Sequence, residues 1–93
     1  MIEGESGHWR VTAPMVMDNA RGLLEAGRAV LKGETEVVDL GSVPKADSSA
    51  LAVMLGWLRT MEARGGQLRF SGVPAGVRSL ADLYGVAELL PLA

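Results

Sequence analysis

The residues that could perform chemistry in this chain are few. Asp39 and Asp47 lie eight residues apart and could form a carboxylate pair, but a strand end and a helix start favour structural roles for them. The only histidine, His8, falls on the polar side of an N-terminal strand, where we expect it to be solvated. With no cysteine, no second histidine and no glycine-rich phosphate loop, thiol catalysis, paired-histidine metal sites and P-loop chemistry are excluded. We therefore expect no enzyme, no catalytic residue, no metal and no cofactor.

The segment Asp47-Ser48-Ser49 is the most informative polar cluster. Asp and Ser are ordinary N-cap residues, so the simpler interpretation is that Asp47 caps a helix. The alternative is that the Ser48 hydroxyl is a switch. A phosphate there would add about −1.5 to −2 charges, which the helix dipole favours but an apolar docking face does not.

The helix predicted to follow has two unlike faces. At 100° per residue, its bulky side chains share one face, which we assign to the core: Ala50, Leu51, Met54, Trp57, Leu58 and Met61. The opposite face is small and weakly polar, with no charge before its arginine: Ser48, Ser49, Ala52, Leu55, Gly56, Arg59 and Ala63. A helix face that only meets water normally carries Lys and Glu, so this face needs another explanation.

Two explanations remain open for the small face. Either loops of the same chain cover it, or it docks another protein. Ala52 and Gly56 would let a partner backbone approach closely, and Leu55 would supply an apolar anchor. Glycine costs roughly 1 kcal/mol relative to alanine in a helix interior, and a close approach would be a reason to keep it. The residues assigned to docking are Ser48, Ser49, Ala52, Leu55, Gly56 and Arg59.

Short strands and helices must position this cluster. Alternating or apolar runs predict strands at 8–13, 36–40 and 67–71, with a short additional strand between Pro14 and Met17. Helices are predicted over 18–32 with Asp18 as N-cap, over about 48–64, and from Pro74 to Gly85. The tail from Val86 is expected to pack onto the core. This order implies an α/β layer structure with helices mainly on one face of the sheet.

Length and composition limit the number of domains and the classes of protein to which the chain can belong. Ninety-three residues suit a single domain over 1–93, and 48% apolar against 22% charged residues indicates a globular chain. A net charge of −2 gives no basic footprint for nucleic acid. No apolar run is long enough to insert in a membrane, and the acidic start is unlike a secretory signal. We expect a small, soluble, cytoplasmic module.

The ordered motifs resemble the STAS domain family, the fold of anti-sigma-factor antagonists. Three segments carry the resemblance: Val37 to Val43, Asp47-Ser48-Ser49-Ala50-Leu51, and Gly65-Gly66-Gln67-Leu68. The segment 72–83 is similar to the last helix of the family. The resemblance covers nearly the whole chain. It implies an STAS fold with an about four-stranded mixed sheet and helices mainly on one face.

Within the family the chain is most similar to the MlaB branch, the STAS subunits of Mla phospholipid ABC transporters. The ending Leu80 to Val86 with Leu89-Leu90-Pro91 carries this likeness, and Ser48 stands where that branch has a threonine that engages the ATPase. The resemblance implies a subunit without catalysis. It would bind an MlaF-like ATPase and, through it, a membrane permease, and so would lie peripheral to the inner membrane and maintain outer-membrane lipid asymmetry.

Two other functions remain open. The Ser48-Ser49 doublet is similar to the anti-sigma-factor antagonists, which implies phosphorylation of Ser48 by an anti-sigma kinase. A small-molecule-binding STAS module is a third hypothesis, although no polar pocket motif supports it.

Overall fold

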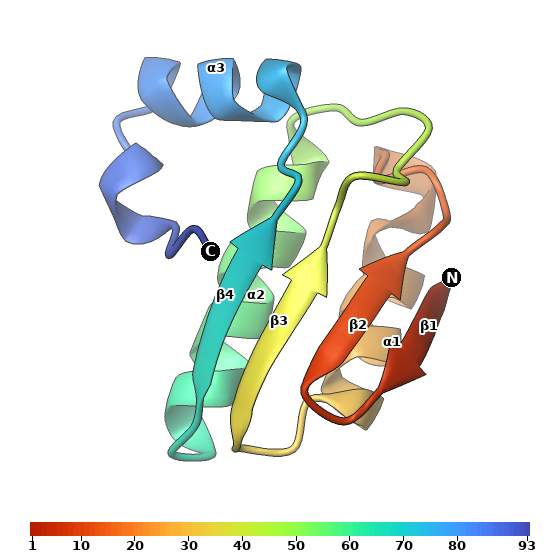
Figure 1. Cartoon of the computed structure of the whole chain (residues 1–93). Helices are drawn as coiled ribbons and strands as arrows, with labels where there is room; N and C mark the ends of the chain where they lie inside the picture. The colour runs from red at the N-terminus through yellow and green to blue at the C-terminus, as the bar shows by residue number, and fades with distance from the viewer.

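A computed structural model describes all 93 residues as a four-stranded mixed sheet with three helices (Figure 1). The strands are β1 (Ile2–Glu5), β2 (His8–Val11), β3 (Thr35–Asp39) and β4 (Gln67–Ser71), and they lie in the order β1-β2-β3-β4. β1 pairs antiparallel with β2, whereas the β2–β3 and β3–β4 pairs are parallel. The helices are α1 (Ala20–Val30), α2 (Ser49–Ala63) and α3 (Ala75–Leu83). The expected fold class is confirmed.

The connectivity explains why α1 and α2 cover the same face. Each of these helices joins two parallel strands, and the chain moves in one direction across the sheet from β2 to β4. Parallel crossovers are right-handed, so two successive crossovers in one direction place both helices on one side. Figure 1 shows them side by side behind the sheet, with α3 at the end of β4. The N-termini of α1 and α2 consequently lie at the carboxyl edge of the parallel strands.

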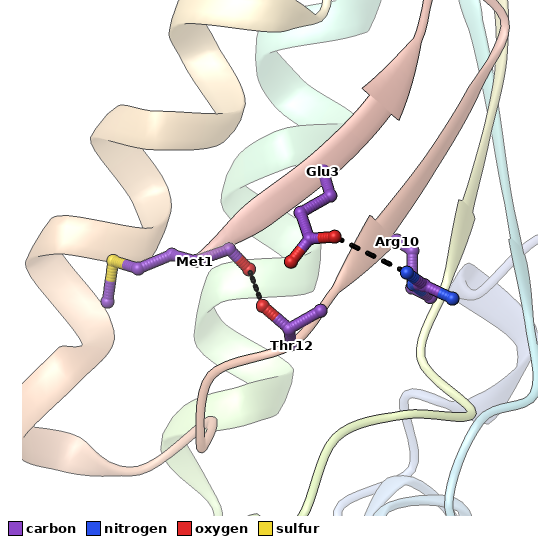
Figure 2. A network of polar contacts seen from close by, with 4 residues as sticks. All are labelled: Met1, Glu3, Arg10 and Thr12. Atoms are coloured by element: carbon purple, nitrogen blue, oxygen red, sulfur yellow. Dashed lines mark hydrogen bonds and ion pairs between the residues drawn. The ribbon is translucent and has the colours of Figure 1, made fainter.

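The two faces of the sheet are chemically distinct. Val11, Val38, Leu68 and Phe70 are buried beneath the helices. The alternate positions form the open face, which is polar except for the half-buried Val37: Glu3, Glu5, His8, Arg10, Thr35, Asp39, Gln67, Arg69 and Ser71. Figure 2 shows the Glu3–Arg10 ion pair, at 3.3 Å, crossing from β1 to β2 on this face.

The core is centred on Trp57 of α2, which is fully buried. Its indole Nε1–H donates to the carbonyl oxygens of Leu23 and Leu24 in α1, at 3.2 and 3.3 Å. The ring can lie there only because residue 27 is glycine. A Cβ on Gly27 would come within 2.0 Å of Trp57 Nε1.

Glu36 is a buried residue that the sequence analysis did not single out; it is only 1% exposed on β3. Its Oε1 accepts hydrogen bonds from the Gly7 N–H (2.7 Å) and the Trp9 indole N–H (3.0 Å), and its Oε2 accepts one from the Lys32 N–H (3.0 Å). One carboxylate therefore joins the β1–β2 turn, β2 and the end of α1.

Two expectations about the N-terminal region were wrong. The predicted short strand before Met17 is only an isolated bridge between Met15 and Ala46, and the fourth strand is instead β1. Asp18 is not an N-cap, because it lies inside a 3₁₀ turn over Met17–Asn19 that precedes α1 and makes no capping bond. β2 also ends at Val11, two residues earlier than predicted.

The C-terminal tail packs onto the core as expected. Leu90 is 8% exposed, and Leu92 forms a parallel bridge with Phe70 on the outer edge of β4. The Phe70 N–H donates to Pro91 O, and the Ala93 N–H donates to Phe70 O, both at 2.8 Å. None of the helices has the length and apolar composition needed to cross a lipid bilayer.

Candidate protein-interaction site

The start of α2 is organised by the carboxylate of Asp47. Its Oδ1 accepts hydrogen bonds from the N–H and the hydroxyl of Ser49, at 2.8 and 2.5 Å. Its Oδ2 accepts a bond from the N–H of Met17, at 3.1 Å, in the turn before α1. Asp47 thus caps α2 and fastens the start of α1 to it.

The same contacts lower the pKa of Asp47. The Ser49 hydroxyl contributes most, followed by the backbone N–H groups of Ser49 and Met17, with a smaller effect from the charge of Lys45. Hydrogen bonds donated to a carboxylate favour its charged form. The negative charge also lies at a helix N-terminus, where the helix dipole stabilises it.

The two serines of the doublet have different environments. The Ser49 hydroxyl is occupied by Asp47. Ser48 is exposed, and no group of the chain forms a hydrogen bond with its hydroxyl. Of the two hydroxyls, only that of Ser48 is free to meet another molecule.

The outward face of α2 follows the predicted phase in part. Ala52 and Arg59 are exposed, and Leu55 is half-buried. Gly56 faces α1 instead, because a Cβ there would lie 2.6 Å from Leu24 Cδ1. The close approach that explains this glycine is therefore made within the chain.

The core side of α2 differs from the predicted face at two positions. Leu58 is half-buried rather than buried, and Val53, which the helical wheel had not assigned to the core, is only 3% exposed. α2 packs against α1, β4 and α3, so neighbouring elements bury more of its surface than one apolar stripe.

Met17 is a further candidate site residue that sequence reasoning missed. Its backbone is bonded to Asp47, next to Ser48, and its side chain is 74% exposed. A large apolar side chain left in water beside a free hydroxyl extends the apolar part of this surface. Met17 begins the 3₁₀ turn that leads into α1, whereas the sequence pattern predicts the end of a short strand there.

The remaining candidate residues are not brought into this site. Asp39 Oδ1 accepts a bond from the N–H of Gly41, at 2.7 Å, and shares no hydrogen-bond donor with Asp47. His8 is exposed on the open face of the sheet. The two aspartates therefore do not act as a bonded pair.

Comparisons with known proteins find one matching family model and solved structures with a similar fold. A family model described as the MlaB STAS domain matches residues 2–91. A candidate anti-sigma factor antagonist from Thermotoga maritima has a similar structure, with a TM-score of 0.77 and 13% identity over 99% of this chain and 83% of that one. A sulfate transporter family protein from Wolinella succinogenes aligns with a TM-score of 0.66 and 22% identity, over 90% of this chain and 70% of that one.

No curated protein sequence gives a significant match. The two structural relatives are too distant in sequence to show more than a shared fold, whereas the family model extends over nearly every residue. The chain belongs to the STAS domain family, and the model that identifies it is that of the MlaB type.

Proposed function

We propose that this chain is a non-catalytic subunit that binds and supports the ATPase of an Mla-type phospholipid ABC transporter. The observation that carries the proposal is the free, exposed Ser48 hydroxyl at the start of α2, in a chain matched by the MlaB family model. The docking surface comprises Met17, Ser48, Ala52, Leu55 and Arg59. Ser49 supports it indirectly, by holding Asp47 in place.

Binding to the purified ATPase subunit of the transporter tests this proposal. We expect the wild-type chain to bind in calorimetry and Ser48→Glu to abolish binding, because a charge would be desolvated against an apolar contact. Ser48→Thr should retain affinity because it keeps the hydroxyl. Ser79→Glu, at an exposed position on α3, is the matched control and should bind normally.

A second variant separates docking from folding. Leu55→Asp should weaken binding while the protein stays folded, because Leu55 is only half-buried. Unfolding of Leu55→Asp would assign Leu55 to the core. A wild-type chain that does not bind the ATPase, or a folded Ser48→Glu variant with unchanged affinity, would refute the proposed docking.

The second candidate function is an anti-sigma-factor antagonist regulated at Ser48. The fold shared with the Thermotoga maritima protein and the free hydroxyl favour it. Incubation with ATP and an anti-sigma kinase, followed by intact-mass measurement, distinguishes the two functions. A mass increase that is lost in Ser48→Ala supports the antagonist, and an unchanged mass counts against it.

A further inference from the structure

The helices α1 and α2 themselves carry more basic than acidic side chains, although the whole chain has a net charge of −2. Along these helices and the two residues after each, five basic side chains are exposed against two acidic ones: Arg21, Arg28, Lys32, Arg59 and Arg64 against Glu25 and Glu62. Three further acidic residues flank the helices: Asp18 and Asp47 lie at their N-terminal ends, away from the arginines at the C-terminal ends, and Glu34 lies in the loop after α1.

None of these five cations forms an ion pair within the chain. The only ion pair of the structure joins Arg10 to Glu3 on the opposite, open face of the sheet (Figure 2). Carboxylates therefore lie more than 4.0 Å from every basic group on the helix surface. The positive charges of these basic groups are therefore available to an anionic group of another molecule.

Two of the guanidinium groups are held in position where α1 meets α2. Arg28 Nε donates to Thr60 Oγ1 at 3.2 Å, and Thr60 Oγ1 donates to Gly56 O at 3.1 Å. Arg64 Nη1 donates to Arg28 O at 2.7 Å and also to Leu31 O. Both Nη groups of Arg28 remain free to donate hydrogen bonds to another molecule, as do Nε and Nη2 of Arg64.

The two positioned guanidinium groups are suited to binding carboxylates of another molecule. A guanidinium presents a planar set of N–H donors that matches a carboxylate in bidentate geometry. Because Thr60 and the α1 carbonyls already hold these two side chains, less rotamer freedom is lost when a ligand binds.

We propose that Arg28, Arg59 and Arg64, here named the cationic end, bind Asp or Glu side chains of the ATPase partner. This inference rests on the proposed function and adds the chemistry that the partner must present. Arg59 lies one helical turn after Leu55, so the cationic end continues the small apolar strip of α2. That continuity favours a protein surface, apolar at one end and acidic at the other, over a lipid headgroup layer.

Charge reversal tests the inference on the purified ATPase. Arg28→Glu and Arg59→Glu should each weaken binding by about tenfold or more, because like charges would then face each other. Arg69→Glu, the same change on the open face of the sheet, should bind as the wild type does. The wild-type affinity should also fall as salt is raised from about 0.05 to about 0.5 M.

The role of Thr60 in positioning Arg28 has a separate readout. Thr60→Val keeps every charge but removes the acceptor of the Arg28 bond, so affinity should fall a few-fold, and Thr60→Ser should restore it. Tryptophan fluorescence of each variant checks that the fold is intact. A Thr60→Val variant that binds as tightly as wild type would show that Arg28 is not held for docking.

Each failure has a distinct meaning. If the wild-type chain does not bind the ATPase, the proposed function is refuted. If the wild-type chain binds, but Arg28→Glu and Arg59→Glu bind equally well and salt has no effect, only the cationic end is refuted. Sedimentation of the chain with phosphatidylglycerol vesicles, abolished by the same two variants, would assign the cationic end to lipid and overturn its assignment to the ATPase.

Discussion

At the scale of single residues, the two carboxylates with the most hydrogen bonds are Glu36 and Asp47, at opposite ends of the sheet. Asp47 follows from the sequence, because an Asp before a helical run is an N-cap signal. The buried position of Glu36 could not be predicted from the sequence, because a charged residue in a short strand is normally assigned to the solvent face. Only the tertiary structure brings three N–H donors from distant segments to its side chain.

Replacing Glu36 should lower the stability of the protein. Glu36→Gln keeps one acceptor oxygen but turns an NH₂ group towards an N–H donor, leaving a buried donor unsatisfied. We expect the free energy of unfolding to fall by about 1–3 kcal/mol. Urea denaturation followed by tryptophan fluorescence measures this change. Glu5→Gln, exposed on β1, is the matched control, and an equally small effect of both substitutions would contradict the assigned role of Glu36.

At the scale of elements, contact between α1 and α2 depends on one glycine in each helix. The sequence places both glycines on the helices but does not say what they face. The structure places Gly27 against the rigid indole of Trp57 and Gly56 against the flexible end of Leu24. The close approach inferred at Gly56 is therefore present, but its partner is α1.

The two glycines should respond differently to alanine. Gly27→Ala forces the Trp57 ring to move and breaks its bonds to α1, so we expect a loss of about 2 kcal/mol or more, within the range for overpacked cores. Gly56→Ala should change stability by less than about 1 kcal/mol, because the higher helix propensity of alanine offsets a rotamer change at Leu24. Parallel urea titrations measure both. Equal losses would show that Leu24 is as constrained as Trp57.

At the scale of the whole molecule, the order of elements from β2 onward was predictable, and the edge strand β1 was not. Alternating strands and helices, together with the family motifs, gave the α/β class and the helix-covered face. β1 was missed because Ile2–Glu5 has one large apolar residue and reads as an acidic start. β1 pairs with β2 in a local hairpin across the two-residue turn Ser6-Gly7, and the apolar pattern of Ile2–Glu5 alone does not signal that pairing.

The other edge of the sheet gives the last prediction. The tail bonds to Phe70 and buries Leu90, so it closes the outer edge of β4. Leu90 and Leu89 are neighbours, but they are 8% and 59% exposed. Leu90→Ala should therefore cost about 2–3 kcal/mol in urea denaturation, whereas Leu89→Ala should cost less than about 0.5 kcal/mol.

The same pair tests whether the tail protects the β4 edge. Released main-chain groups on an edge strand pair readily with another chain. Light scattering should therefore show that Leu90→Ala self-associates increasingly as protein concentration rises. Leu89→Ala should self-associate no more than the wild type. A destabilised Leu90→Ala variant that does not self-associate would mean that Leu90 anchors the core without the tail shielding β4. Equal stability losses in the two variants would contradict the observed packing of the tail itself.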